Sequence, residues 1–521
     1  MMIKFDEMAA QVQEHQWPFL ATVVVILYTV SALAQHLRAA KVPLVGRRFA
    51  FEPQFVTNLR FFRHAGEVLG NGYARFKHTT FKFIRADAEM LVLPAKYVNE
   101  LRNLPNTVAS PTLAHVHNLM GRHTNMDVIL RNNLHFRTLQ EKVTPSLGSL
   151  TAPMQEELNH ALQYDFPNNE DEWITIKPYH TILRLVSRLS ARVFLGTPLC
   201  RNEQWLEIST QFTENVFVSL VILRLFPIWL HGFISMVLPS AWRGSAYVRQ
   251  AKRLLIPEVK RRQQEINAGK QGSDEHRNIL SWMIEIGKDN EKQPADLAHL
   301  EVIMSLASIH TSQMNAVHVL YDLASHPAYI EDLREEIKQV INTDGPWMEW
   351  KKTAFSKLRL LDSFMKESQR LNPPTQLSYH RILLKNHTLN DGTILYKGSH
   401  ICMPVTAIQN DEAVTPDPSV FDGFRYYKMR QREDEGHLHQ FATTEATNLN
   451  FGHGKYACPG RFFAALEIKI VLVRLIMDYD FKLKDGQTRP ANLFAHEFIF
   501  PNPEGEFLVK RRRAEERLQL I

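Results

Sequence analysis

Apolar residues recur at three- and four-residue spacing over most of the chain beyond residue 110, which is the spacing of the buried face of an α-helix. The pattern is clearest at 151–166 and 179–196, and residues 295–325 form one long helical pattern. Before residue 110 the apolar runs are shorter, and residues 81–98 predict a pair of strands followed by a helix. The chain is therefore predicted to be mainly α with small β-sheets.

The N-terminal region carries an apolar run of its own. Residues 17–34 contain no charged side chain and just reach the length that spans a bilayer as a helix. A cleaved signal peptide is the competing interpretation, but such a peptide carries positive charge ahead of a shorter apolar core, whereas acidic residues predominate here. Basic residues follow the run, and the positive-inside rule therefore predicts that the rest of the chain is cytosolic. We therefore predict a lumenal segment at 1–16, a retained endoplasmic reticulum membrane anchor at 17–36, a basic, proline-containing hinge at 37–48 and one large domain at 49–521.

Charge and cysteine content narrow the class of protein. The formal net charge of +6 is modest and dispersed, which argues against nucleic-acid binding and suits an acidic protein partner or an anionic membrane surface. The three cysteines, Cys200, Cys402 and Cys458, are too few for a disulfide scaffold and fit a reducing compartment.

Cys458 lies in a glycine-rich loop, 449–460, directly before an apolar, helix-forming run. Glycines let a backbone turn tightly and approach a large flat group. The positive end of the following helix favours a thiolate over a thiol, and a thiolate is an axial ligand for haem iron. The alternative is a buried structural cysteine, which is the usual role of a free cysteine.

The loop resembles the haem-binding loop of the cytochrome P-450 family, whose pattern is Phe-Gly-x-Gly-x-x-x-Cys-x-Gly. Every fixed position is matched, by Phe451, Gly452, Gly454, Cys458 and Gly460. The resemblance implies the fold of that family, with a long central helix over the haem. It also implies haem b as cofactor, with its iron held by the axial thiolate of Cys458.

One position departs from the family. Arg or His usually stands two residues before the cysteine and pairs with a haem propionate, whereas this chain has Tyr456. The resemblance implies that Arg381 reaches a propionate. Basic residues at 131–142 also fall near the segment that crosses a propionate in the family, although a solvated helix face is the alternative for each: Arg131, His135, Arg137 and Lys142.

The long helical pattern at 295–325 matches the central helix of the family in part. Thr311 falls on the family's threonine, and His310 replaces the usual acid. The resemblance implies that Thr311 orients protons toward dioxygen. His310 either delivers protons in place of the acid or only packs in the helix, and a helical threonine can simply bond back to its own backbone.

A Glu-x-x-Arg motif at Glu367 and Arg370 is followed by Phe421-Asp-Gly-Phe-Arg425. Two such residues three apart face one side of a helix and are often an exposed pair of little energetic consequence. The resemblance implies instead a buried network of Glu367, Arg370 and Arg425 that supports the haem-binding region, in which removal of one partner is costly.

A second apolar stretch, 214–240, is interrupted by Arg224, Pro227 and His231. A membrane-spanning helix tolerates these residues poorly. The resemblance implies that this stretch is a lid over the substrate entrance that dips into the bilayer, and an exposed apolar patch there suits a lipophilic substrate.

The function implied by the resemblance is that of a monooxygenase. It inserts one atom of O₂ into a C–H or C=C bond of a lipophilic small molecule, with electrons from NADPH delivered by a reductase or by cytochrome b5. The motif spellings look closest to fungal members that act on secondary metabolites such as terpenoids, meroterpenoids or indole alkaloids. Two alternatives stay open, a haem-thiolate isomerase or dehydratase of the same fold and a non-catalytic, membrane-anchored binding protein.

Overall fold

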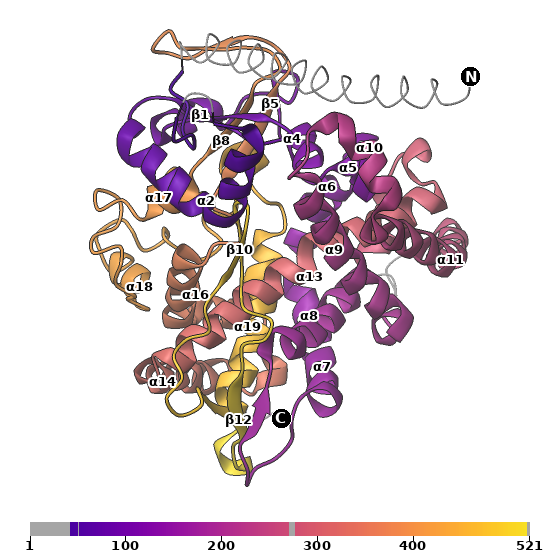
Figure 1. Ribbon diagram of the computed structural model, residues 1–521. Coiled ribbons are helices and arrows are strands. Elements are labelled where there is room, and N and C mark those ends of the chain that lie inside the picture. Colours follow the sequence, from indigo (N-terminus) through magenta and orange to yellow (C-terminus); the bar gives the residue numbers. More distant parts are fainter. Residues whose placement is uncertain (1–41, 50–51, 270–276, 518–521) are drawn as a thin grey trace, which may run out of the picture.

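A computed structural model describes residues 42–49, 52–269 and 277–517 (Figure 1). The predictions for 1–16 and 17–36 lie outside these residues. Helices dominate the described part, as the apolar pattern predicts. The helices are α2 Gln54–Phe76, α3 Val98–Leu101, α4 Pro111–Asn118, α5 Gly121–Thr124, α6 Leu134–Thr138, α7 Thr144–Asp165, α8 Pro178–Phe194, α9 Glu203–Leu223, α10 Ile228–Val237, α11 Pro239–Asn267, α12 Ile279–Ile286, α13 Pro294–Ser325, α14 Ala328–Asp344, α15 Lys352–Lys357, α16 Arg359–Leu371, α17 Val405–Gln409, α18 Arg425–Met429 and α19 Arg461–Asp478.

Helix α13 is the element on which the others pack. It starts with Pro294 in its first turn, where the missing N–H of proline is tolerated. Almost every residue along its 32-residue length is buried. Helices α8, α9, α11, α16 and α19 all contact it, and it crosses the middle of the molecule (Figure 1). A helix that is buried all round belongs to the core of a large domain.

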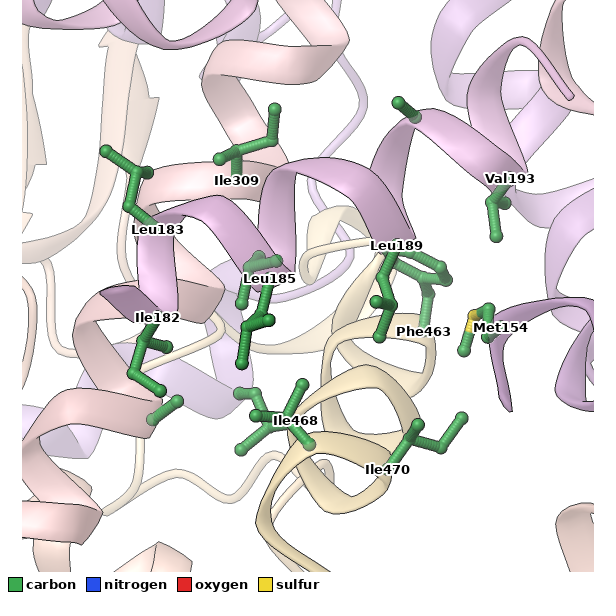
Figure 2. Close-up of a cluster of buried hydrophobic side chains, with 14 of the residues drawn as sticks. Met154, Ile182, Leu183, Leu185, Leu189, Val193, Ile309, Phe463, Ile468 and Ile470 are labelled. Atoms are coloured by element: carbon green, nitrogen blue, oxygen red, sulfur yellow. The ribbon is translucent and has the colours of Figure 1, made fainter. Parts of the chain in front are cut away.

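An apolar cluster joins α8, α13 and α19 (Figure 2). Leu185 and Leu189 of α8 lie among Ile309 of α13 and Ile468 and Ile470 of α19, and all five are buried. Full burial of one such side chain stabilises the fold by about 1.5–3 kcal/mol. This packing fixes the position of α19, and therefore of the loop that precedes it, relative to α13.

The strands form small sheets. A five-stranded sheet has the order β1-β2-β8-β5-β3, with β2 and β8 parallel and the other pairs antiparallel. A three-stranded sheet has the order β4-β12-β9, and β6–β7 and β10–β11 are hairpins. The strands are β1 Phe81–Ile84, β2 Glu89–Val92, β3 Ala109–Ser110, β4 Ile174–Ile176, β5 Ser378–Leu383, β6 His387–Thr388, β7 Ile394–Leu395, β8 His400–Met403, β9 Tyr479–Lys482, β10 Leu493–Ala495, β11 Phe498–Phe500 and β12 Phe507–Arg511.

Helices α9 and α10 divide the apolar stretch 214–240 between them. Within the described residues α9 is the one helix long and apolar enough to cross a membrane, and 56% of its most apolar 18-residue window is buried inside the protein. Helix α10 instead exposes Trp229 by 78% and Phe233 by 63%. Arg224, at the end of α9, is buried and donates to Glu497 Oε1 at 2.7 Å. The apolar surface is therefore that of α10, and the interrupting arginine belongs to the interior.

Candidate functional site

The loop before α19 is shaped by its own backbone. The N–H of Cys458 donates to the carbonyl oxygen of Phe451 at 2.8 Å, and the N–H of Gly452 donates to that of Leu449 at 2.8 Å. Gly452 and Gly454 have positive φ angles of 66° and 77°, which residues with a side chain rarely adopt. These bonds turn the chain back on itself and present Cys458 at the start of α19.

Gly454 also allows a close approach between two segments. A Cβ atom at this position would lie 2.5 Å from the Cβ and the carbonyl oxygen of Arg102, which is too short for any side chain. The N–H of Lys455 donates to that same carbonyl at 3.1 Å. The motif glycine is therefore required to bring the loop against the end of α3.

Cys458 is accessible although protein surrounds it. Its side chain is exposed by surface area, yet burial by the surrounding protein raises the pKa of the thiol. The N–H groups of Gly460 and Arg461 and the charge of Arg461 lower the pKa, but less than burial raises it. The N–H groups at the start of α19 therefore act in the direction expected from the sequence, toward the thiolate, while burial opposes them.

Two residues of α13 are exposed in the middle of this otherwise buried helix. They are Ala307 and Thr311, one helical turn apart. The Thr311 hydroxyl donates to the carbonyl oxygens of Ala307 at 2.9 Å and Ser308 at 3.1 Å. This is the backbone contact that a helical threonine commonly makes, and here it leaves the side chain accessible from one face of α13.

His310 lies on a different face of α13. It is buried, and its Nε2 lies 3.2 Å from the carbonyl oxygen of Thr210 on α9. Burial lowers the pKa of His310 to about 4, although the Thr210 carbonyl raises it. The ring is thus neutral at physiological pH. These contacts favour the packing role over proton delivery.

Glu367, Arg370 and Arg425 form a network. Arg370 donates to both carboxylate oxygens of Glu367, at 2.9 and 2.8 Å, and Arg425 Nε lies 3.2 Å from each of them. Glu367 and Arg370 are fully buried. Arg370 also donates to Asn410 and to the carbonyl oxygen of Pro418, each at 2.8 Å. The network therefore ties α16 to α18 and to the segment between them.

Arg381 lies between two tyrosines. Its guanidinium carbon is 4.4 Å from the ring centre of Tyr379 and 5.6 Å from that of Tyr456. Arg381 is buried, and among the described residues no carboxylate forms an ion pair with it. A buried cation without an acid partner is costly. Tyr456 stands where the family usually has Arg or His. It therefore contacts Arg381, the basic residue that is expected to reach a haem propionate.

The basic residues at 131–142 divide into two groups. Three of them form ion pairs with acidic residues, and among these Arg131 has the most exposed side chain: Arg131 with Asp296, Arg137 with Glu291 and Lys142 with Glu285. His135 differs, because its Nδ1 is buried without a hydrogen-bond partner. Burial lowers the pKa of His135 to about 4.

Glu467 is a residue that sequence reasoning missed. It is fully buried in α19, nine positions after Cys458, and its Oε1 accepts from the Ser190 hydroxyl at 2.7 Å. The signal in the sequence is an acidic residue inside an apolar run, since acids are almost never fully buried without a partner.

The residues gathered here fit a haem. Cys458 offers an accessible sulfur, Arg381 offers a buried cation that lacks an acid partner among the described residues, and the exposed face of α13 carries small residues. A thiolate for iron, a cation for a propionate and room above the ring are the protein features that a haem-thiolate site needs.

The chain matches the family model described as Cytochrome P-450 over residues 80–509. It is 46% identical over 490 residues to the cytochrome P-450 monooxygenase AN1598 of Emericella nidulans, with 94% of this chain and 91% of that protein covered. It is 43% identical to the cytochrome P-450 monooxygenase olcJ of Penicillium canescens, with 95% and 92% covered. It is 39% identical to the ent-kaurene oxidase of Gibberella intermedia, with 91% and 88% covered.

One solved structure shows the same fold at low sequence identity. Retinoic acid-bound cyanobacterial CYP120A1 is 21% identical, with a TM-score of 0.62, and the alignment covers 87% of this chain and 96% of that one.

Proposed function

The chain belongs to the cytochrome P-450 family of haem monooxygenases, and we propose that it oxidises a lipophilic secondary metabolite of a fungus. The overall reaction is RH + O₂ + NADPH + H⁺ → ROH + H₂O + NADP⁺, or the corresponding epoxidation of a C=C bond. Electrons pass from NADPH through a membrane-bound reductase, with cytochrome b5 as a further donor. Haem b with an axial cysteine thiolate is the cofactor of the family.

The substrate class is supported by the relatives and by the lid. The relatives are named as fungal monooxygenases and as an ent-kaurene oxidase, and the latter name favours a terpenoid among the candidate substrates. Helix α10 presents Trp229 and Phe233 to solvent. An exposed apolar helix suits contact with a membrane in which an apolar substrate is dissolved.

Several residues of this chain would hold the cofactor, each in a different way. Cys458 would supply the sulfur that holds the haem, and the backbone of Phe451, Gly452, Gly454 and Gly460 shapes the loop around it. Arg381 neutralises a propionate. Glu367, Arg370 and Arg425 fix the chain segments that support this region. When bound, the haem supplies oxygen activation, which thiolate ligation favours by promoting O–O cleavage.

Thr311 places a hydroxyl oxygen at the open face of α13, where it would orient a proton donor. Its hydroxyl oxygen can accept a further hydrogen bond while its proton is held by the Ala307 and Ser308 carbonyls. Ala307 leaves room beside it because its side chain is a single methyl group. The protein thereby positions a hydroxyl oxygen that can accept a hydrogen bond at this face.

We also propose the location and the domain limits. Residues 1–16 are lumenal, residues 17–36 anchor the protein in the endoplasmic reticulum membrane, residues 37–48 form a hinge and residues 49–521 form the cytosolic catalytic domain. The uncharged run at 17–34 and the basic residues that follow it support this arrangement.

The observation that carries the proposal is the accessible sulfur of Cys458 in a loop that matches the family motif. The test is the difference spectrum of the reduced, carbon monoxide-bound protein, compared between wild type and Cys458→Ser. We expect the red-shifted thiolate band in wild type and its loss, with all turnover, in the variant, because a serine oxygen is a harder ligand that stays protonated. A Cys402→Ala variant removes another thiol and serves as the control.

Turnover with a reductase, NADPH and candidate terpenoids then decides the reaction. Oxygen from ¹⁸O₂ in the product supports monooxygenation. A product formed without NADPH or O₂ would show an isomerase or dehydratase of the same fold, and a protein without the thiolate band would be a binding protein.

A further inference from the structure

Three histidine rings meet edge to face at one place in the fold, and we call them the histidine cluster: His117 of α4, His380 of β5 and His400 of β8. The ring centre of His400 lies 5.4 Å from that of His117 and 5.3 Å from that of His380. Within the described part of the chain, Nδ1 of each ring and Nε2 of His400 are buried without a hydrogen-bond partner. Buried polar groups without partners are costly, so a structural role alone explains this cluster poorly.

Two arginines and two acids lie beside the histidine cluster, and all four are buried. Oε1 of Glu497 accepts from Arg85 at 3.1 Å and from Arg224 at 2.7 Å. Arg85 also donates to both carboxylate oxygens of Asp87, and one of these oxygens lies 4.0 Å from Nδ1 of His117. The two positive and two negative charges balance one another. A further charged group at this place would therefore lack a counter-ion.

The rings of the histidine cluster are neutral at physiological pH. Burial lowers the pKa of His380 to about 3 and that of His400 to about 2, and it also lowers the pKa of His117. A neutral imidazole carries one N–H donor and one acceptor nitrogen. His400 therefore presents one donor and one acceptor that the described residues leave unpaired, and the group that fits beside it must both donate and accept.

The histidine cluster joins the lid to the strand that carries Arg381. Arg224 stands between α9 and the exposed helix α10, and it donates to the carbonyl oxygen of Asn118, the neighbour of His117, at 2.7 Å. His380 directly precedes Arg381 in β5. The side chain of His117 is 31% exposed and His380 is half-buried. These two rings therefore form the edge at which a bound molecule can reach the cluster.

We propose that His117, His380 and His400 bind a hydroxyl group of the substrate, which is therefore a terpenoid alcohol and not a hydrocarbon. The proposal rests on the proposed monooxygenase function and concerns the specificity of the same reaction. A hydroxyl group donates one hydrogen bond and accepts others, as His400 requires. A hydrocarbon leaves the nitrogens unpaired, a ketone can only accept, and a carboxylate adds a charge that the balanced arginines and acids do not neutralise.

This specificity implies a place in a reaction sequence. The hydroxyl group must be present before this protein acts, so a reaction that installs it comes earlier. An earlier hydroxylation, or a terpene cyclisation that ends with the addition of water, supplies such a substrate.

The first test measures binding to the haem-loaded protein through the shift of its haem absorption band. The probes are two matched pairs of diterpenes, abietadiene with abietadienol and ent-kaurene with ent-kaurenol, in which the members differ by one hydroxyl group. We expect wild type to bind the alcohol of a pair at least about tenfold more tightly than the hydrocarbon, because only the alcohol pairs the imidazole nitrogens.

Two variants remove imidazole groups from the histidine cluster. His400→Leu removes the donor and the acceptor at its centre, and His117→Leu removes a ring at its accessible edge. Both should bind the hydrocarbons as wild type does and the alcohols about tenfold more weakly than wild type does. His299→Leu is the matched control, because His299 is a buried histidine of α13 whose Nε2 has no partner among the described residues. It should keep the preference for the alcohol.

Thermal unfolding separates binding from a structural role. Leucine is close to histidine in size and leaves no buried polar group unpaired, so ligand-free His400→Leu should unfold at the wild-type midpoint or above it. In wild type the alcohol should raise the midpoint more than the hydrocarbon does. A lower midpoint in His400→Leu, together with an unchanged preference for the alcohol, would show that the imidazole only holds the fold and would overturn the proposal.

The outcomes for this subsite and for the proposed function are distinguishable. A missing thiolate band contradicts the proposed function, and a wild-type protein that binds no member of either pair contradicts the terpenoid class and the subsite together. A wild-type protein that has the band and binds alcohol and hydrocarbon equally would hold only water at these nitrogens, which overturns the subsite alone. A preference for the alcohol that persists in both His117→Leu and His400→Leu would overturn its assignment to these histidines.

Discussion

At the scale of single residues, Tyr456 is the position where this chain departs from its family. Its ring lies 5.6 Å from the guanidinium carbon of Arg381, and its hydroxyl accepts from the N–H of Asn106 at 3.0 Å. A cation over an aromatic ring is stabilised by about 0.5–2 kcal/mol. Tyr456 therefore helps to fix the position of the Arg381 guanidinium.

We expect Tyr456→Ala to lower the haem content of the purified protein several-fold, because Arg381 loses one of its two aromatic contacts. Tyr456→Phe keeps the ring and should retain haem as wild type does. The haem-to-protein ratio after gel filtration measures the effect. Equal losses in both variants would assign the role to the hydroxyl group and its bond to Asn106 instead.

His310 predicts a dependence of stability on pH. Its pKa in the folded protein is about 4, against an ordinary value of 6.5, so between these values the unfolded chain binds a proton that the folded protein does not. The stability that neutral His310 contributes is thus present above pH 6.5 and is lost as the pH falls toward 4. At about 1.4 kcal/mol per pKa unit, the loss is about 3 kcal/mol.

We therefore expect His310→Gln, which keeps a donor for the Thr210 carbonyl, to reduce the fall in thermal-unfolding midpoint between neutral pH and pH 4. His64→Gln is the control, since the His64 side chain is 53% exposed. If His310 delivers protons instead, product per NADPH will fall in His310→Gln at neutral pH.

At the scale of elements, the Glu-x-x-Arg motif has its effect through α16. Spacing places Glu367 and Arg370 on one face of a helix, and the structure buries that face completely. An exposed pair of this kind contributes about 0.2–0.5 kcal/mol, whereas loss of one partner from a buried pair costs about 3–5 kcal/mol. Burial therefore decides the importance of the motif.

We expect Glu367→Ala and Arg370→Ala to yield little or no haem-loaded protein, because the loss is a large share of a typical folding free energy of about 5–15 kcal/mol. Glu331→Ala is the matched control. It removes one acid of an i,i+3 pair with Arg334, and the Glu331 side chain is 74% exposed. Haem content and soluble yield are the measurements. Normal haem content in the Glu367 and Arg370 variants would contradict the effect of burial.

The lengths of several elements followed from the sequence. The pattern at 295–325 became α13, Pro294–Ser325, and the pattern at 179–196 became α8, Pro178–Phe194. The strand pair expected within 81–98 is β1 with β2. Periodicity predicts these elements because each packs one continuous apolar face. The short strands β3 and β4 have no such signal, since pairing with distant segments creates them.

At the scale of the whole molecule, α10 presents an apolar surface that no other part of the described residues covers. Trp229 and Phe233 are exposed, while Arg224 beside them is buried against Glu497 and the carbonyl oxygen of Asn118. These contacts hold the end of α9 on the β10–β11 hairpin and on α4. The uncovered helix is therefore fixed at one end to the body of the protein.

We expect a protein that lacks residues 1–40 to bind haem and to keep part of its membrane association through α10. Adding Trp229→Ser and Phe233→Ser should abolish what remains, because burial of each large apolar side chain in the lipid interface is lost. Flotation with liposomes in low-salt buffer measures the effect, and Trp173→Ser is the control because Trp173 is exposed elsewhere. A truncated protein that does not float at all would show that α10 does not contact the bilayer.

The sequence by itself determined the features that depend on neighbouring residues: the Cys458 loop with its glycines, the helical patterns and the Glu367–Arg370 spacing. Packing decided the rest. His310 and Thr311 are adjacent in the chain, yet one is buried against α9 and the other is exposed, because successive residues of a helix point in different directions. Ser190 and Glu467 are separated by 277 positions and share a hydrogen bond. Only the packing of α8 and α19 against α13 brings such groups together, since no local periodicity specifies which faces of distant helices meet.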